Sequence, residues 1–467
     1  MGHASDVASV ARELFGWTEL RAGQGEAIAG VIAGTDTLAV MPTGHGKSAI
    51  YQVAGAMLDG PAIVVSPLIA LQLDQIEGLA ERPNAPSGVA VNSNQGQRKN
   101  ERAWSRIADG TATYLFLSPE QLAKDDVIER LQPLGVSLFV VDEAHSVSSW
   151  GHDFRPEYLH LGSAIEKLGH PVVLALTATG SPPVRDEIVD KLGMREPRIL
   201  GSGFDRPNLR LEVVRHEDDQ EKRTAVVAEI AGLAKPGLLY VSTRHDAERY
   251  ADDLTGHAVT AVAYHAGLGS AARKVAYDDF HQDLTDVVVA TSAFGMGIDK
   301  PDVRFVVHAA ITDSLESYYQ EIGRAGRDDE PARATLHYRV EDLALRNYFT
   351  SHSSEQQEHI ERSRLAMMRA YAETRRCRRQ FLLAYFGEEL PQPCGNCDTC
   401  ASGTAYELNS ADGADDPFTP ETRVTHHVWG SGVVVSALPD RITVFFAAEG
   451  YKTIAREAVD LGILTLA

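Results

Sequence analysis

Short, uninterrupted apolar runs recur along most of the chain and are separated by stretches of helical periodicity. The runs are rich in Val, Ile and Leu and do not alternate with polar residues, which is typical of strands buried on both faces of a parallel sheet. They fall into two sets that meet near residues 201–207. The first set is 37–40, 62–66, 88–92, 113–117, 138–141 and 172–176, and the second is 238–242, 259–264, 287–291, 304–307 and 334–338. The pattern predicts two tandem doubly wound α/β domains.

The pattern changes toward the C-terminus. Residues 403–421 are small and acidic with two prolines, which favours a linker, and the short alternating runs 433–435, 441–446 and 452–454 predict a small β-barrel. The predicted domains are 1–203 and 204–345 for the two α/β domains, 346–402 for a small helical module, 403–421 for the linker and 422–467 for the barrel. The barrel residues carry no obvious chemistry, so a structural cap competes with a partner-binding module.

Composition and charge limit the class of protein. A hydrophobic content of 44% in 467 residues supports ordinary packed cores, and no apolar run approaches the ~20 residues of a membrane span. Residues 1–6 show no basic region followed by an apolar stretch, so we expect no secretion signal and a cytoplasmic protein without a membrane partner.

The net charge of −21 argues at first against a nucleic-acid partner, since phosphate binding depends on Lys and Arg. The basic residues are unevenly distributed, however, with seven arginines against two glutamates in 361–380. Arg362, Arg369, Arg376 and Arg379 are predicted to share one face of a helix, either as a basic groove or as a solvated face.

The segment 41–48 predicts a phosphate-binding loop between the strand 37–40 and a following helix. Its glycines let backbone N–H groups surround phosphates, Lys47 reaches the β- and γ-phosphates, and the Ser48 hydroxyl binds Mg²⁺. The loop residues predicted to bind the nucleotide are Thr43, Gly44, Gly46, Lys47 and Ser48. The loop alone could also be a chance Gly-Lys-Ser turn.

A pair of carboxylates follows the apolar strand 138–141. Asp142 is predicted to hold Mg²⁺, and Glu143 to orient or deprotonate the attacking water. An acidic strand end at this distance from the loop makes the chance turn a poor explanation. The two segments together predict a nucleoside triphosphatase with Lys47 and Glu143 as catalytic residues.

The second α/β domain has no phosphate loop of its own but carries a glycine-spaced turn within 320–328. Arg324 and Arg327 of this turn are predicted to stabilise the charge that develops on a phosphate, which typically accelerates hydrolysis by ~10³–10⁵. Arginines in surface salt bridges remain the alternative.

All four cysteines lie within twenty-four residues, at Cys377, Cys394, Cys397 and Cys400. This clustering in a chain without other cysteines favours a structural, tetrahedral Zn²⁺ site. Disulfides need an oxidising compartment that nothing in the sequence implies, and free thiols are the remaining alternative.

Taken together, these blocks resemble the RecQ family of ATP-dependent DNA helicases over roughly residues 10–402. The resemblance implies two RecA-like domains, ATP as the nucleotide, and a zinc-binding module that contains the four cysteines. In 15–24, Arg21 and Gln24 match an adenine-reading motif, with Gln24 as the base reader. Arg324 and Arg327 match the nucleotide-facing arginines, with Arg327 the better arginine finger.

Two further matches concern the DNA path. The segment 149–158 resembles an aromatic-rich loop that couples single-stranded DNA to hydrolysis, and Thr177 and Thr179 match residues that link the nucleotide site to DNA. The residues that this resemblance assigns to DNA binding are Trp150, Phe154, Arg155, Thr177 and Thr179. Aromatic faces stack on any base, and the loop is too polar to serve mainly as core.

The sequence departs from the family at two places. His45 stands where the family has Gly, and its side chain can point outward. After Cys400 only 67 residues remain, too few for the winged helix and the further domain of full-length members. The segments 424–434 and 450–454 instead look similar to the Tudor-like tail of UvrD/PcrA-type helicases, which implies a protein partner such as RNA polymerase.

The predicted function is that of an ATP-dependent 3′→5′ DNA helicase or translocase in DNA repair or recombination. Its direction is implied by the resemblance alone. The expected cofactors are ATP, Mg²⁺ and Zn²⁺, the expected partners are single-stranded and forked DNA, and the chain is expected to act as a monomer. An RNA helicase, and an ATP-gated DNA-binding recruitment factor that unwinds little duplex, are the alternatives.

Overall fold

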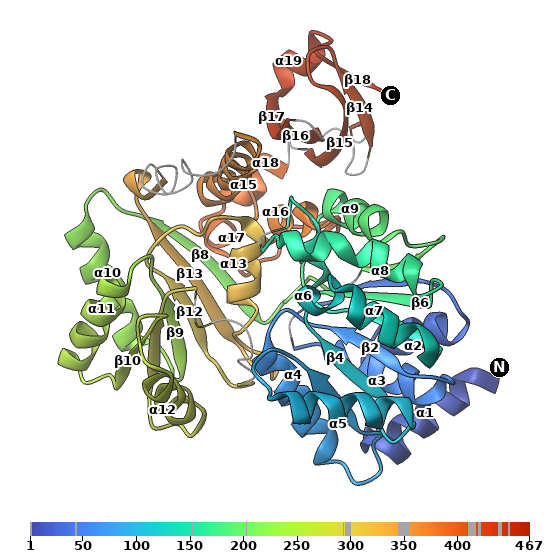
Figure 1. Cartoon of the computed structure of the whole chain (residues 1–467). Coiled ribbons are helices and arrows are strands. Elements are labelled where there is room, and N and C mark those ends of the chain that lie inside the picture. The colour runs from blue at the N-terminus through green and yellow to red at the C-terminus, as the bar shows by residue number, and fades with distance from the viewer. Residues whose placement is uncertain are drawn as a thin grey trace. The chain divides into compact units, whose positions relative to one another are not determined.

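The computed structural model describes residues 2–42, 44–151, 153–201, 203–292, 294, 300–343, 355–409, 417–418, 422–437, 441–446 and 449–467. The chain divides into two compact units, Met1–Gly203 and Phe204–Ala467 (Figure 1).

The first unit is built on a seven-stranded parallel sheet with the order β3-β4-β2-β5-β6-β1-β7. The strands are β1 Thr37–Val40, β2 Ala62–Val65, β3 Gly88–Val91, β4 Tyr114–Leu117, β5 Leu138–Val141, β6 Val172–Thr177 and β7 Arg198–Gly201. The helices are α1 Gly2–Phe15, α2 Gln24–Ile32, α3 Ser48–Met57, α4 Ile69–Ala80, α5 Gln97–Ala108, α6 Pro119–Leu122, α7 Asp125–Leu131, α8 Leu161–Lys167 and α9 Pro182–Leu192. Three 3₁₀ turns complete the unit: η1 Gln132–Leu134, η2 Ala144–Val147 and η3 Pro156–His160.

Burial explains why the sequence predicted these strands so well. Every residue of β1, β2, β3, β4 and β5 is buried, because helices cover both faces of the sheet. The strand β7 was not predicted. It is an exposed edge strand and therefore lacks a continuous apolar run.

The second unit contains a six-stranded parallel sheet with the order β10-β11-β9-β12-β13-β8. Its strands are β8 Leu209–Arg215, β9 Gly237–Tyr240, β10 Ala261–Tyr264, β11 Val287–Ala290, β12 Phe305–His308 and β13 Ala332–Tyr338. Its helices are α10 Asp219–Gly232, α11 Arg244–Gly256, α12 Ser270–His281 and α13 Leu315–Ile322. The edge strand β8 was also missed, because only one of its faces is buried and its apolar residues alternate with polar ones.

Among the described residues, the helices between this sheet and residue 410 are α15 Glu355–Glu373, α16 Arg378–Tyr385, α17 Asp398–Ala401 and α18 Thr404–Asn409. The predicted single arginine face is wrong, because α15 ends at Glu373 and Arg379 lies on α16. Arg362 and Arg369 pair with acids one helical turn away, at Glu358 and Glu373. The solvated face is therefore the better description of α15.

Residues 422–467 form an antiparallel sheet with the order β17-β16-β15-β14-β18, here called the C-terminal domain. Its elements are β14 Arg423–His426, β15 Gly430–Ala437, β16 Arg441–Phe446, β17 Gly450–Ala455, α19 Arg456–Asp460 and β18 Leu464–Leu466. A small apolar core that includes Val444 and Phe446 fills the curled sheet (Figure 1). The predicted fold class, two parallel-sheet domains with a small antiparallel C-terminal domain, is confirmed. Among the described helices, none is both long and apolar enough to pass through a membrane.

Candidate nucleotide site and metal centre

The predicted phosphate loop joins β1 to α3 at the carboxyl edge of the first sheet, where ligands of such sheets bind. Gly44 and Gly46 have φ angles of 82° and 71°, a backbone conformation that favours glycine. A Cβ at Gly46 would also lie only 2.9 Å from Nε2 of Gln24. His45 does not have a positive φ, so the loop conformation tolerates a side chain at this position. Thr43 lies outside the described residues.

Gln24, the first residue of α2, and Arg21, which lies just before that helix, hold this loop. Gln24 is buried, and its Nε2 donates hydrogen bonds to the carbonyl oxygens of His45 at 2.7 Å and Gly46 at 2.9 Å. Its Oε1 accepts from the backbone N–H of Arg21 at 2.8 Å, and the Arg21 guanidinium donates to the Gly44 carbonyl. Gln24 and Arg21, both predicted to bind the nucleotide, therefore both contact the phosphate loop. That Gln24 reads adenine stays a prediction.

Asp142 and Glu143 follow β5 at the same edge. Asp142 is half-buried, and burial together with the adjacent Glu143 charge raises its pKa to about 7, although Lys47 opposes the shift. A divalent cation at this carboxylate would supply the missing charge, so the donor set fits Mg²⁺. Glu143 has a φ of 49°, and a non-glycine residue in this region typically costs ~1–3 kcal/mol. The strain at Glu143 is consistent with a functional position.

His145 connects the carboxylate pair to the neighbouring strand β6. Its Nδ1 lies 3.0 Å from Oγ1 of Thr177 and 3.3 Å from Oε2 of Glu143. The Thr177 hydroxyl donates its only proton to the Thr179 carbonyl at 2.7 Å, so Nδ1 of His145 must carry the proton that Thr177 accepts. The Thr177 carbonyl also accepts from the N–H of Met41, the first loop residue, at 3.0 Å. Three functional segments therefore meet at Thr177.

The aromatic-rich loop packs directly on the Asp-Glu-Ala-His segment. A Cβ at Gly151 would lie 2.1 Å from the His145 carbonyl oxygen, so only glycine permits this approach. Trp150 is buried, whereas Phe154 is half-buried. The expectation that the polar loop would keep Trp150 out of the core is therefore not met in this conformation.

Glu187 on α9 anchors the same loop. Its carboxylate accepts hydrogen bonds from the hydroxyls of Ser148 at 2.7 Å and Ser149 at 3.0 Å. Arg155 forms an ion pair with Asp153 at 3.0 Å. Glu187 was not predicted from the sequence, because nothing in its local pattern distinguishes it from a surface acid. His152 lies outside the described residues.

In the second unit, the predicted arginine turn follows α13 and is held by Arg206 and Asn208, two residues of the segment 204–209 for which the sequence predicted no specific role. The Arg206 guanidinium donates to the carbonyl oxygens of Ala325 at 2.9 Å and Gly326 at 2.7 Å. The Asn208 amide donates to the carbonyl of Gly326 at 2.8 Å and of Glu330 at 2.9 Å. The segment 204–209 is therefore a clamp for the arginine turn, and its polar residues beside Pro207 were the available signal in the sequence.

Arg324 and Arg327 differ in burial within this turn. Arg324 is buried beside Tyr240, and its Nε has no hydrogen-bond partner among the described residues. Arg327 is half-buried, and its Nε donates to the Gly323 carbonyl at 3.5 Å. The unpaired Nε of Arg324 is an unused donor, which suits a residue that binds an anion.

The four cysteines form one cluster, with all Sγ atoms within 4.8 Å of one another. Tetrahedral Zn–S bonds of about 2.3 Å place sulfurs about 3.8 Å apart, so the donor set fits Zn²⁺. Hydrogen bonds within the cluster, first with Cys377, raise the pKa of Cys394 and lower that of Cys397. Four thiolates at this spacing repel one another, so they need a cation between them.

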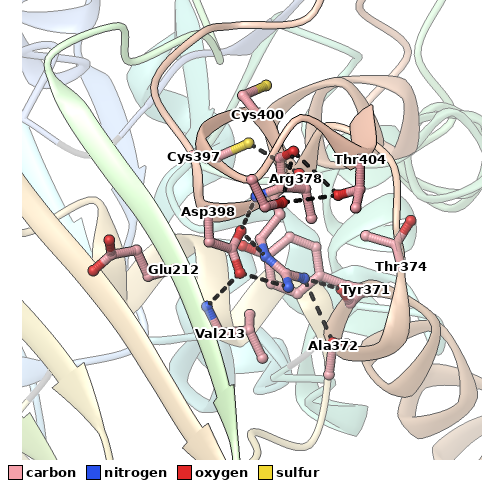
Figure 2. A network of polar contacts seen from close by, with 12 residues as sticks. Glu212, Val213, Tyr371, Ala372, Thr374, Arg378, Cys397, Asp398, Cys400 and Thr404 are labelled. Atoms are coloured by element: carbon pink, nitrogen blue, oxygen red, sulfur yellow. Dashed lines mark hydrogen bonds and ion pairs between the residues drawn. The ribbon is translucent and has the colours of Figure 1, made fainter. Parts of the chain in front are cut away.

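A buried ion pair ties the cysteine cluster to the second sheet. Arg378 donates to both carboxylate oxygens of Asp398, at 2.5 Å and 2.8 Å, and Asp398 accepts from the N–H of Val213 on β8 at 3.2 Å. Figure 2 shows Arg378 between Asp398 and the carbonyl groups of Tyr371 and Ala372. The turn that carries Cys397 and Cys400 is thus fixed to β8.

The cluster region also contacts the clamp of the arginine turn. Nη2 of Arg379 donates to the Leu209 carbonyl at 2.5 Å, and the Asn396 amide donates to the Pro207 carbonyl at 3.0 Å. The predicted metal ligands and the predicted arginine turn are therefore connected by hydrogen bonds through 204–209. The segment 295–299, which the family resemblance also covers, lies outside the described residues.

Comparisons with known protein families agree with this geometry. The sequence profile of the DEAD/DEAH box helicase family matches residues 21–187, and that of the helicase conserved C-terminal domain matches 221–329. The RecQ zinc-binding profile matches 340–401. A profile described as protein of unknown function (DUF3553) matches 423–464.

The fold and these segments define a two-domain helicase-type protein. The chain is 40% identical over 392 residues to the ATP-dependent DNA helicase RecQ of Pasteurella multocida, covering 84% of this chain and 61% of that protein. It is 38% identical to the protein of the same name from Bacillus subtilis, covering 85% of this chain and 67% of that protein. The chain belongs to the RecQ family, as the sequence predicted, and spans about three fifths of the length of the Pasteurella relative.

The fold also occurs among solved structures. A structure of S. cerevisiae Dbp5 bound to Gle1 and IP6 has a TM-score of 0.56 and 17% identity, and covers 77% of this chain and 95% of that chain. At this identity the likeness concerns the fold alone.

Proposed function

We propose that the chain is an ATP-dependent 3′→5′ DNA helicase or translocase of the RecQ type, which acts in DNA repair or recombination. The observation that carries the proposal is the meeting of the phosphate loop, the Asp-Glu-Ala-His segment and the Thr-Ala-Thr segment at Thr177. A motor needs such a connection, because hydrolysis must alter the grip on the strand.

Within the proposed site, Lys47, Ser48 and Asp142 hold the phosphates of ATP and its Mg²⁺. The cation, when bound, neutralises charge on the transferred phosphate. Glu143 orients the attacking water and accepts its proton. Oε2 of Glu143 lies 3.3 Å from Nδ1 of His145 but has no hydrogen-bond partner among the described residues, so this oxygen is available to the water.

Arg324 and Arg327 are proposed to stabilise the charge of the transition state. The clamp from Arg206 and Asn208 fixes the backbone from which both side chains project. Fixed donors are worth more than mobile ones, because they need no reorganisation during the reaction.

The aromatic loop is proposed to sense single-stranded DNA through Trp150, Phe154 and Arg155. Because Gly151 contacts the His145 carbonyl, a shift of this loop on DNA binding would be transmitted to the residue beside Glu143. Trp150 is buried in the described conformation, so contact with a base requires the loop to move.

Zn²⁺ is proposed as a structural ion held by Cys377, Cys394, Cys397 and Cys400. The C-terminal domain is proposed to bind a protein partner such as RNA polymerase. We also propose that the chain acts in the cytoplasm as a monomer on single-stranded and forked DNA.

A second candidate function is an ATP-gated DNA-binding recruitment factor that separates little duplex. It is favoured by apolar side chains exposed on the C-terminal domain, at Val428, Leu461 and Leu466. A pull-down with and without residues 422–467 would test the partner, and ATPase assays with DNA and RNA strands would test the rival RNA helicase.

The deciding experiment measures unwinding of a 3′-tailed duplex beside ATPase stimulation by single-stranded DNA on one preparation. Strand separation with stimulated ATPase supports a helicase, and stimulation without separation supports a translocase. We expect Glu143→Gln to lower the turnover by about 100-fold or more while ATP still binds, since general-base catalysis supplies about that factor. Normal turnover in this variant would remove Glu143 from the mechanism.

A further inference from the structure

The C-terminal domain is joined to the preceding helices through its edge strand β17. The backbone N–H of Tyr451 donates to Oγ of Ser363 at 2.6 Å, and Nε2 of His359 donates to the Glu449 carbonyl at 2.6 Å. Both partners lie on α15. An edge strand presents unpaired backbone groups, and here α15 satisfies some of them. The domain is thus docked on α15 of its own unit and is more than a tethered appendage.

The side chain of Tyr451 leaves the C-terminal domain at this contact and packs against α16. Its hydroxyl lies 3.2 Å from that of Tyr385 on α16, and the two rings are 5.5 Å apart. The Tyr385 hydroxyl in turn hydrogen-bonds the Glu316 carboxylate. Tyr451 is 5% exposed, and Tyr385 and Glu316 are each 1% exposed. The three side chains form a buried row, here called the Tyr451 row.

The hydrogen bonds of the Tyr451 row have a fixed direction. Burial, reinforced by the Glu316 charge, raises the pKa of Tyr385 well above its usual range, so its hydroxyl keeps its proton. Tyr385 gives that single proton to Glu316, so the bond between the tyrosines must use the Tyr451 proton. Oε2 of Glu316 is buried without a hydrogen-bond partner among the described residues. A carboxylate with so few donors depends strongly on the ones it has.

Glu316 lies in the first turn of α13, and the arginine turn begins where this helix ends. The helix runs from Leu315 to Ile322, and Gly323 and Arg324 follow directly. At 1.5 Å per residue it is about 12 Å long and moves as one piece. A change in the contact at Glu316 therefore tilts the element that positions Arg324.

We infer that the C-terminal domain regulates the motor from within the chain, because the docked Tyr451 fixes α13 and so positions the arginine turn. This gives a function to a domain whose family has none described. The inference rests on the proposed ATPase, since the arginine turn matters only if it acts on ATP. Release of the domain lowers turnover, and retained docking keeps the turn aligned.

The test uses the full zinc-loaded chain with single-hydroxyl substitutions. Tyr451→Phe removes the donor at the far end of the row, and Tyr385→Phe removes the central link. Thr453→Val is the matched control. It removes a hydroxyl from the same strand, and this hydroxyl hydrogen-bonds Thr443 on the neighbouring strand instead of a residue of the Tyr451 row. Hydrogen–deuterium exchange is measured for peptides that cover α13 and α15, together with kcat and KM for ATP.

We expect faster exchange in α13 and a fall in kcat of about fivefold for Tyr451→Phe, well short of the ~10²-fold cost of a 1 Å displacement. Tyr385→Phe should lower kcat more strongly. The KM for ATP should stay at the wild-type level in both tyrosine variants. In Thr453→Val, the exchange, kcat and KM should all match those of the wild type. Wild-type exchange in α13 and wild-type kcat in both tyrosine variants would overturn the inference. A wild-type chain without ATPase would refute the proposed function instead, and exchange in α13 would still decide whether Tyr451 holds that helix.

Discussion

Nδ1 of His145 lies 3.0 Å from Oγ1 of Thr177, and both side chains are buried. The contact joins the loop after β5 to the end of β6, and β6 lies between β5 and β1 in the sheet. The phosphate loop follows β1, and its first residue, Met41, donates its N–H to the Thr177 carbonyl, so this pair forms a polar connection between the carboxylates and the phosphate loop. The proposed coupling depends on it.

Thr177→Val should reduce the coupling between DNA and hydrolysis. Valine preserves shape but removes the hydroxyl that accepts from Nδ1 of His145 and donates to the Thr179 carbonyl, and the loss of such buried hydrogen bonds costs ~1–3 kcal/mol. We expect the ratio of DNA-stimulated to unstimulated ATPase to fall several-fold in a titration with single-stranded DNA. Thr111→Val, which removes an exposed hydroxyl in the same unit, is the control. An unchanged ratio would argue that Thr177 only supports the fold.

Asp142→Asn should stabilise the magnesium-free protein at alkaline pH. The pKa of Asp142 is raised to about 7 by burial and by Glu143, whereas an unfolded Asp titrates near 3.9. The folded state binds this proton more tightly, so the free energy of unfolding falls as pH rises from about 4 to about 7. The substituted asparagine does not titrate, so the variant does not lose this part of the free energy of unfolding. We expect its Tm to exceed that of the wild type at pH 8 by roughly 5 °C.

The same measurement at pH 5 should show little difference, since Asp142 is then protonated in the folded chain. Scanning fluorimetry without added magnesium or chelator is suitable, because a chelator would also remove zinc. Asp109→Asn is a control of opposite sign: hydrogen bonds from Thr111 lower the pKa of Asp109, so this substitution should not stabilise at pH 8. A lower Tm of Asp142→Asn at pH 8 would contradict the assignment.

Arg206→Lys should impair catalysis without loss of nucleotide binding. Lysine keeps the charge but cannot donate to the Ala325 and Gly326 carbonyls with one planar group. The arginine turn then loses its fixed position, and we expect kcat to fall about tenfold or more at a nearly unchanged KM. Arg210→Lys, which alters a partly exposed ion pair with Glu212, provides the comparison. Equal kcat values for the two variants would show that the clamp is dispensable.

Removal of zinc should unfold more than the cysteine loop. Structural Zn²⁺ often contributes ~10–16 kcal/mol of apparent binding energy, which here would stabilise the turn of Cys397, Asp398 and Cys400. Without that turn, Asn396 no longer holds the Pro207 carbonyl. We expect about one Zn²⁺ per chain, and its release by a chelator should lower the Tm and the ATPase together. A chain that keeps its Tm after losing the metal would indicate a non-structural ion.

The sequence by itself determined the features that depend on residues near one another in the chain. The strands β1 and β5 were predicted at their observed bounds, because burial on both faces leaves a local apolar run. The glycines of the phosphate loop and the four clustered cysteines could also be predicted. A positive φ angle favours glycine, and a zinc site requires residues that can bind the metal, so in both cases the local requirement restricts the residue type directly. The family followed from these blocks.

Only the tertiary structure decided which side chains meet across the chain. Arg206 and Gly326 are separated by 120 positions, and Tyr385 and Tyr451 by 66, so no local sequence pattern predicts either contact. The burial of Trp150 and the end of α15 at Glu373 also depended on packing, which overrode a polar flank and a charge periodicity. Such contacts are selected by the free energy of the whole fold, whereas a sequence window records only the preferences of its own residues.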